Sequence, residues 1–197
     1  MQGALDFYYD IGSPYSYIAA ARIEDAAQER GVTVRWRPFL LGGVFRAVGN
    51  TMPAAVPARA KYMLDDLRRW ADELKIPFNF SSSFPHNTLL AMRALSAAKP
   101  TELVALSQSL FRAAWVDNLD VSSPDVVAQA LGETGPSLIQ ATQNPEIKER
   151  LKTTTQAAID AGAFGAPSFV VDGALFWGND RLEQALAAAQ RPSKLGA

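Results

Sequence analysis

Residues 5–39 read LDFYYDIGSPYSYIAAARIEDAAQERGVTVRWRPF, and this stretch decides the fold. Its opening, Leu5–Asp10, predicts a strand because it is rich in aromatic residues and ends just before a glycine and a proline. From Pro14 the apolar residues recur at helical spacing until Gly31, a residue type that commonly ends a helix. Alternation of apolar and polar residues returns over Val32–Phe39. This β–α–β order favours two parallel strands joined by a right-handed crossover.

The long middle of the chain has helical patterns and no convincing strand. Residues 42–57 contain several glycines and prolines, which predict a loop around at most a short helix. Beyond this loop the apolar residues recur at helical spacing. The helices that we expect here span Ala58–Leu74, Thr88–Ala98, Thr101–Trp115, Pro124–Leu131 and Pro145–Ala161.

Strand patterns return only near the end of the chain. The segments Ser168–Val171 and Leu175–Trp177 flank Asp172-Gly173, a dipeptide typical of a two-residue hairpin turn. A last helix is expected from Asp180 to about Gln190, because an aspartate is a favoured helix cap.

The complete order, β–α–β, then helices, then β–β–α, predicts an α/β protein with a thioredoxin-like fold and a large all-helical insertion. We expect residues 1–41 and 162–197 to form the thioredoxin-like domain. Residues 42–161 are expected to form a linker and an inserted helical subdomain. A chain of 197 residues suits one domain with such an insertion.

Composition excludes several classes of function. The formal net charge is −1, so the basic surface typical of a nucleic-acid binder is not expected. The chain has no cysteine, which excludes disulfides, zinc thiolate sites, iron–sulfur clusters and a thiol nucleophile of its own. The single histidine, His86, leaves little room for a histidine-based metal site. Without a signal-peptide pattern or a membrane-spanning stretch, we expect a cytoplasmic protein that does not bind membranes.

The start of the first helix, Ser13-Pro14-Tyr15-Ser16, is where thioredoxin-like proteins carry their catalytic group. The first and fourth residues of this segment, Ser13 and Ser16, carry hydroxyls, which cannot form a disulfide, so a dithiol oxidoreductase is excluded. The unpaired amides and the positive dipole end of a helix start favour an anion, to which the Ser13 hydroxyl can donate. The residues alone leave open that Ser13 only caps the helix.

Five segments carry a resemblance to a known family: DFYYDIGSPYSYIAAARIE, GNTMPAAVPARAKYMLDDLRRWA, FPHNTLLAMRA, GAPSFVVDG and FWGNDRLE. In these segments, which together span nearly the whole chain, the sequence resembles the 2-hydroxychromene-2-carboxylate isomerases. That family has a DsbA-like thioredoxin fold and is related to the kappa-class glutathione transferases. The resemblance implies a glutathione-dependent isomerase of aromatic hydrocarbon catabolism. The implied reaction interconverts 2-hydroxychromene-2-carboxylate and trans-o-hydroxybenzylidenepyruvate by reversible thiolate addition.

The resemblance also implies a glutathione site. Ser13 would be catalytic by donating a hydrogen bond to the thiolate of glutathione. Pro167 would follow a cis peptide bond, which leaves the Ala166 backbone able to pair with the cysteinyl part of glutathione. The Asp180 carboxylate would accept the α-amino group. Without the resemblance, an ordinary turn proline and a plain helix cap would explain Pro167 and Asp180. The implied cofactor-binding residues are Ser13, Tyr15, Ala166, Pro167, Trp177, Gly178, Asn179 and Asp180.

For the substrate, the resemblance implies a small aromatic carboxylate or another electrophile. A carboxylate needs a cation or hydrogen-bond donors to hold it. Family members often carry a lysine in the segment that matches Leu40–Gly49, whereas this chain has Phe45 and Arg46 there, which leaves the particular substrate open. The residues implied to bind substrate are Arg46, Asn50, Arg59 and Asn87, and Lys61 lies in the same segments.

Other functions remain open at this point. A kappa-like glutathione transferase would share the cofactor site but leave the sulfur on an electrophile. A cysteine-free thioredoxin-like binding module would be no enzyme at all. A hydrolase triad of Ser13, His86 and an aspartate is rejected because no G-x-S-x-G motif surrounds Ser13, and His86 is expected at the surface or the rim of the pocket. A homodimer is implied by the resemblance only.

Overall fold

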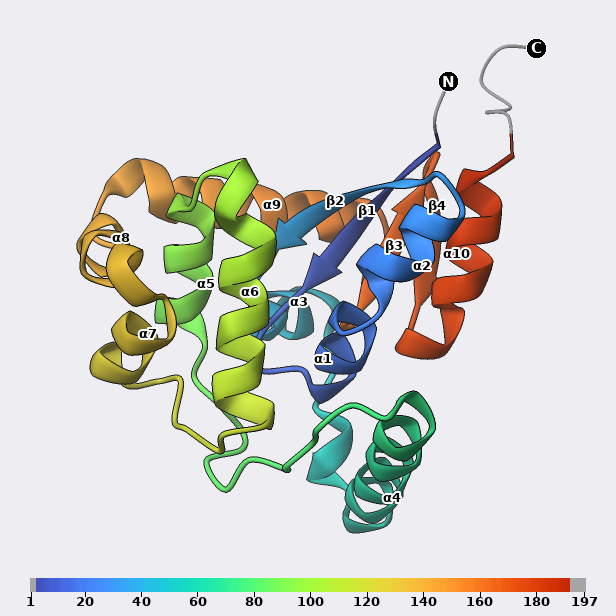
Figure 1. Cartoon of the computed structure of the whole chain (residues 1–197), viewed down its shortest axis with the longest axis horizontal. Coiled ribbons are helices and arrows are strands. Elements are labelled where there is room, and N and C mark those ends of the chain that lie inside the picture. The colour runs from blue at the N-terminus through green and yellow to red at the C-terminus, as the bar shows by residue number, and fades with distance from the viewer. Residues whose placement is uncertain (1–2, 192–197) are drawn as a thin grey trace.

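The computed structural model describes residues 3–191 and has a four-stranded mixed sheet in the order β2–β1–β3–β4 (Figure 1). Strand β1 (Ala4–Tyr9) runs parallel to β2 (Thr33–Pro38) and antiparallel to β3 (Ser168–Val171). Strand β4 (Ala174–Trp177) completes the antiparallel hairpin with β3. The predicted parallel pair, the hairpin and the thioredoxin-like α/β fold are therefore confirmed. The ends of the expected thioredoxin-like domain, residues 1–2 and 192–197, lie outside the described residues.

The hairpin turn has the conformation that its sequence predicts. Asp172 and Gly173 have φ angles of 46° and 79°, so both residues of the turn are left-handed. Such a turn matches the right-handed twist of the two strands that it joins.

The first predicted helix is in fact two helices, α1 (Pro14–Ala20) and α2 (Ile23–Glu29). The break falls at Arg22, whose φ of −133° is not helical. The guanidinium of Arg22 points away from its own helix and donates to the Asn179 carbonyl at 2.8 Å. After the break, α2 buries Ile23 against the core.

The other helices lie where the sequence predicts them, to within a few residues, with one exception. They are α3 (Leu41–Val48), α4 (Pro57–Leu74), α5 (Leu89–Ala97), α6 (Pro100–Trp115), α7 (Pro124–Ala130), α8 (Gly135–Ala141), α9 (Pro145–Asp160) and α10 (Leu182–Ala189), with 3₁₀ turns η1 (Pro53–Ala55), η2 (Gly132–Thr134) and η3 (Asn179–Arg181).

The exception is α8, which the sequence does not predict because Gly135 and the proline after it resemble a loop. Proline is tolerated in the first turn of a helix, where its missing amide costs no hydrogen bond. The glycine allows close packing of α8 on α7, since a Cβ atom there would lie 2.0 Å from the Ala128 carbonyl oxygen.

The sheet has one apolar core on each face. Phe7 of β1 stacks on Phe169 of β3 at 5.4 Å and meets the edge of the Trp36 ring at 5.0 Å, on the face covered by α1, α2 and α10. Tyr8 points to the opposite face, where it packs with Phe39 near α3 and α9. Burial of a large apolar side chain stabilises the fold by about 1.5–3 kcal/mol, so these strands anchor the molecule.

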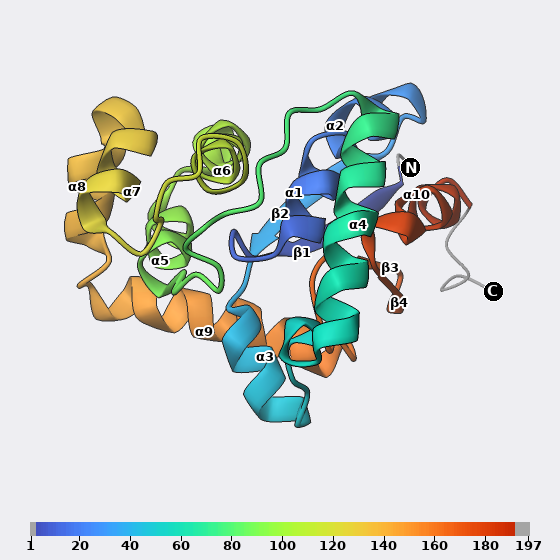
Figure 2. The same ribbon diagram turned by 90° about the horizontal axis from the view of Figure 1, so that it is seen from below.

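The helical insertion lies beside the sheet and shares its core. Helices α5 to α8 group at one side of the sheet, and α9 leads from them back to it, whereas α4 stands apart next to α1 (Figures 1 and 2). Phe111 and Trp115 of α6 belong to the same buried cluster as Phe7. Among residues 3–191 no helix has the length and apolar character needed to cross a membrane.

Candidate active site

A cavity of about 580 Å³ opens beside the start of α1. Its walls come from the loop before α1, from α3 and α4, from the segment before α5, and from the residues on either side of the β3–β4 hairpin. Most of the side chains that line it are apolar. They include Leu41, Phe45, Met52, Met63, Phe84 and Trp177.

Ser13 lies at the edge of this cavity, and its hydroxyl takes part in two hydrogen bonds. Its hydroxyl oxygen accepts a hydrogen bond from the Ser16 amide at 3.2 Å, which makes Ser13 the cap of α1. Its hydroxyl proton is donated to the Ala166 carbonyl at 3.1 Å, across 153 positions of sequence. Ser13 is 4% exposed, and the Ala166–Pro167 bond is cis. For the Ser13 hydroxyl to donate a hydrogen bond to a bound sulfur, the sulfur must therefore replace the Ala166 carbonyl as its acceptor.

The turn from Trp177 to Asp180 adjoins the same wall. The Gly178 amide donates to the Pro167 carbonyl at 3.0 Å, and Trp177 lines the cavity. Gly178 has a φ of 106°, and a Cβ atom there would lie 2.5 Å from the Asp180 carboxylate, so only glycine fits. Asn179 is buried, whereas the Asp180 carboxylate is half-exposed and lies 3.4 Å from the Arg181 guanidinium.

Tyr15 joins the start of α1 to α4. Its hydroxyl lines the cavity side and donates to the Asp66 carboxylate at 2.8 Å. Burial raises the pKa of the Tyr15 phenol most, and the carboxylates of Asp66 and Asp180 raise it further. The phenol therefore stays protonated, and the negative surroundings suit a positively charged ligand group.

The structure places some of the residues expected to bind substrate in the lining of the cavity and the others outside it. Asn50 and Arg59 line the cavity, whereas Arg46, Asn87 and Lys61 lie outside its lining. Among the lining residues that the structure describes, Arg59 is the only lysine or arginine.

The polar groups of these residues are engaged to different degrees. The Asn50 amide donates to the Phe164 carbonyl at 2.8 Å and its oxygen accepts from the Thr51 amide at 2.8 Å, so this side chain mainly holds its loop. Lys61 pairs with Asp65 at 2.7 Å on the exposed face of α4. Arg59 has no ion pair within residues 3–191 and remains available to an anion.

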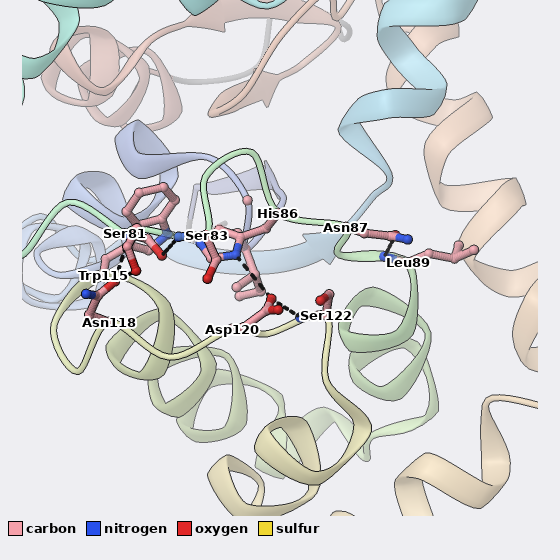
Figure 3. Close-up of polar contacts among 12 residues, drawn as sticks. Ser81, Ser83, His86, Asn87, Leu89, Trp115, Asn118, Asp120 and Ser122 are labelled. Atoms are coloured by element: carbon pink, nitrogen blue, oxygen red, sulfur yellow. Dashed lines mark hydrogen bonds and ion pairs between the residues drawn. The ribbon is translucent and has the colours of Figure 1, made fainter.

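His86 lines the cavity, which agrees with the expected position at the rim of the pocket. Its imidazole has no exposed surface, so the alternative position at the protein surface is wrong. The ring packs edge-on against Trp115 at 5.4 Å, and Nδ1 lies 3.9 Å from the Asp120 carboxylate (Figure 3). Burial lowers the pKa of the imidazole, and Asp120 opposes this effect. The ring packs against Trp115 of α6, which is distant in sequence, and local sequence does not reveal such a contact.

Asp10 is one of the lining residues that the sequence analysis does not single out. It follows β1 and is 1% exposed, yet it borders the cavity near Ser13. The Gly12 and Leu41 amides donate to it at 2.9 and 2.8 Å. The signal for it was an aspartate among apolar residues, three positions before the serine at the helix start.

Comparison with known proteins agrees with the fold. Residues 4–190 match the family model described as the DSBA-like thioredoxin domain. A solved structure of 2-hydroxychromene-2-carboxylate isomerase superposes with a TM-score of 0.83 at 28% sequence identity, covering 94% of this chain and 93% of that chain.

The proteins that are similar in sequence include two kinds of enzyme, glutathione transferases and isomerases. Human glutathione S-transferase kappa 1 is 32% identical in an alignment 197 positions long, gaps included, that covers 91% of this chain and 87% of the relative. The 2-hydroxychromene-2-carboxylate isomerase of Sphingobium xenophagum is 30% identical in an alignment 188 positions long that covers 93% of this chain and 96% of the relative.

Proposed function

The chain belongs to the DSBA-like thioredoxin family, and within it we propose that the protein is a glutathione-dependent isomerase. The proposed reaction interconverts 2-hydroxychromene-2-carboxylate and trans-o-hydroxybenzylidenepyruvate, a step in the breakdown of aromatic hydrocarbons. One observation carries the proposal: the Ser13 hydroxyl stands against the Ala166 carbonyl at the edge of a largely apolar cavity. The isomerases among the relatives support the same reading.

The residues around Ser13 fit glutathione. Ser13 offers a hydroxyl donor to a sulfur, and the Ala166 carbonyl can accept from the main chain of a peptide-like ligand. The acidic side chains near Tyr15, Asp66 and Asp180, suit the α-amino group of the glutamyl arm. Bound glutathione would supply a thiolate that adds reversibly to the conjugated system of the substrate and leaves again after rotation about the former double bond. Pro167, Gly178 and Asn179 would hold the main chain of this site in place.

Ser13 would act by favouring the ionised thiol. A hydrogen bond to a charged acceptor contributes about 1.5–3 kcal/mol, which lowers the pKa of that acceptor's conjugate acid. The apolar lining has the opposite effect, since burial disfavours a charge. The Ser13 contribution has to exceed this penalty for the thiolate to form near neutral pH.

The apolar side of the cavity would bind the aromatic ring. Phe45, Phe84 and Trp177 present apolar surface there, and a volume of about 580 Å³ is typical of a small-molecule site. Arg59 would hold the carboxylate, because it is the cation of the described lining.

A kappa-like glutathione transferase is the second candidate, favoured by the 32% identity to the human kappa enzyme. Both reactions need the Ser13 site, and they differ in whether the sulfur remains on the product. Mass spectrometry of the products separates them, since a transferase leaves a stable conjugate.

The decisive experiment follows the ultraviolet spectrum of a hydroxychromene-carboxylate mixed with the protein and glutathione. We expect isomerisation that requires added thiol, because the chain has no cysteine. Equal activity of dialysed, thiol-free protein would rule out the mechanism. Failure to bind glutathione at all would instead favour a cysteine-free binding module. A cytoplasmic homodimer is part of the same proposal, and light scattering of the purified chain tests the dimer.

A further inference from the structure

Three segments that line the cavity meet at one buried carboxylate, that of Asp10. The Gly12 amide, just before α1, donates to one oxygen at 2.9 Å. The Leu41 amide, the first of α3, donates to the other oxygen at 2.8 Å. The side chain of Thr88, the residue that precedes α5, lies beside the same carboxylate. One side chain thus connects the starts of three helices that lie far apart in sequence.

At two of these helix starts the residue before the helix makes no capping hydrogen bond through its side chain. These residues are Leu40 before α3 and Thr88 before α5. The packing is tight as well, because a Cβ atom at Gly12 would lie 3.1 Å from the Thr88 methyl group and 3.4 Å from an Asp10 oxygen. The Asp10 carboxylate therefore acts as the common acceptor of this part of the cavity wall.

Asp10 also bears directly on Ser13. The Ser13 amide donates to the main-chain carbonyl of Asp10 at 3.0 Å, so the chain from Asp10 to Ser13 forms a closed turn. Gly12 lies inside this turn and is fixed by the carboxylate. Displacement of the carboxylate would therefore move the Ser13 hydroxyl relative to the Ala166 carbonyl.

We propose that Asp10 is a positioning residue of the thiol site, which fixes the Ser13 hydroxyl by holding Gly12, Leu41 and Thr88 in one arrangement. The identity of the thiol as glutathione rests on the proposed function, whereas the role of the carboxylate in organising the wall does not. A carboxylate suits this role because both oxygens accept, and an asparagine would turn an amide group towards one of the donors. Burial raises the pKa of Asp10, and the hydrogen bonds from the Leu41 and Gly12 amides oppose this effect.

A positioning role and a purely electrostatic role predict opposite results for Asp10→Asn. Removal of a negative charge alone would lower the pKa of a nearby thiol, because a carboxylate disfavours a second anion. Loss of position would raise the pKa of the thiol, because the Ser13 donor would no longer reach the sulfur. The sign of the change in Asp10→Asn therefore distinguishes the two roles.

The experiment compares Asp10→Asn with two other full-length variants. Thr88→Val removes the hydroxyl that lies beside the Asp10 carboxylate and leaves the charge in place. Tyr9→Phe is the matched control. Tyr9 directly precedes Asp10, and this variant removes its buried hydrogen bond to Ser107, which is 2.6 Å long and lies in the core. For each variant, amide hydrogen exchange is measured at Gly12 and Leu41, and the pKa of bound glutathione is measured by thiolate absorbance.

In Asp10→Asn we expect exchange at Gly12 and Leu41 to become roughly 10–100-fold faster, the size of a lost hydrogen bond to a charged group. The pKa of bound glutathione should rise towards that of the free thiol. Thr88→Val should change both quantities in the same direction by less, and Tyr9→Phe should change neither. If Asp10→Asn does not fold, the comparison of Thr88→Val with Tyr9→Phe tests the inference. Faster exchange and a higher pKa of bound glutathione in Thr88→Val, with neither change in Tyr9→Phe, would support it.

Unchanged exchange at Gly12 and Leu41, or a lower pKa of bound glutathione in Asp10→Asn, would overturn the inference. Failure of the unmodified protein to bind glutathione would be a different result. It would remove the proposed function, and the exchange rates would still decide whether Asp10 organises the cavity wall.

Discussion

The two sides of the cavity are built in different ways. The sheet side, which holds Ser13, Ala166 and the turn after β4, is assembled largely from hydrogen bonds that involve the main chain. The helix side, formed by α3 and α4, presents mostly apolar side chains and one cation, Arg59. Few polar contacts join the two sides, and they include Tyr15 to Asp66 and Asn50 to the Phe164 carbonyl.

This difference separates what the fold supplies from what the sequence supplies. Main-chain groups at the helix start and beside Pro167 are present in any chain that adopts this fold. The side chains of α3 and α4 are specific to each sequence, as the Phe45 and Arg46 found here illustrate. We therefore expect the sheet side to set cofactor binding and the helix side to set substrate choice.

The largest effect is expected from Arg59→Ala on the helix side. Loss of a charge-assisted contact to the substrate carboxylate should lower kcat/KM roughly 10–100-fold, while glutathione affinity stays the same. Steady-state kinetics with each substrate varied in turn measures both quantities. Lys61→Ala, which removes a cation two positions away that pairs with Asp65, should leave kcat/KM unchanged. Equal losses in both variants would show that Arg59 has no specific role.

A smaller effect is expected from Asp180→Ala on the sheet side. The carboxylate is half-exposed and close to Arg181, so solvent and this neighbour weaken its contact with the ligand. The dissociation constant of glutathione should rise about tenfold, with little change in turnover at saturation. Calorimetry measures this constant, and Asp160→Ala on the exposed end of α9 provides the control. An unchanged constant would remove Asp180 from the cofactor site.

A still smaller effect is expected from Arg46→Ala and Asn87→Ala. Both side chains are exposed and lie outside the lining of the cavity, although the family resemblance implies that they bind substrate. Substitutions at such surface positions usually change free energies by less than about 0.5 kcal/mol, so kcat/KM should change by no more than about twofold. A loss comparable with that of Arg59→Ala would mean that the helix side moves to enclose the substrate.

The smallest effect is expected on the free energy of unfolding, and it concerns His86 in the segment before α5. The pKa of His86 is lowered by burial, so the unfolded chain takes up a proton more readily than the folded one. The contribution of the neutral imidazole is complete above the unfolded pKa of about 6.5 and is lost as the pH falls through the lower folded value. The free energy of unfolding in urea should therefore decline as the pH falls below about 6.5, and His86→Phe should flatten this decline. An identical pH dependence in both proteins would contradict the burial of a neutral imidazole.

The fold could be predicted because its signals are local. The local signals are the aromatic run of Leu5–Asp10, the cap and proline at Ser13-Pro14, and the hairpin dipeptide Asp172-Gly173. Each depends on a few neighbouring residues. The helix α8 was missed because Gly135 is required by packing against Ala128, a contact that short-range patterns do not contain.

The site could be predicted only in part. Ser13 and Ala166 lie together because the fold brings the helix start and the residue before Pro167 into contact. That they bind glutathione stays a prediction. Asp10 was missed and the burial of the His86 ring was not predicted, since their positions depend on donors and aromatic rings from distant segments. Tertiary contacts of this kind leave no periodic trace in the sequence.

The central claim is that Ser13 stabilises a thiolate at the start of α1, and the pKa of bound glutathione tests it most directly. A free thiol has a pKa of about 8.5, and we expect the bound thiol to titrate at roughly 7 in the unmodified protein. In Ser13→Ala the pKa should return most of the way to the free value. The buried Ser16 hydroxyl has no hydrogen-bond partner within residues 3–191, so Ser16→Ala should leave the pKa unchanged. Difference absorbance of the thiolate, followed against pH in the three proteins, gives these values. A bound pKa no lower than that of free glutathione, or equal values in the unmodified protein and Ser13→Ala, would contradict the account.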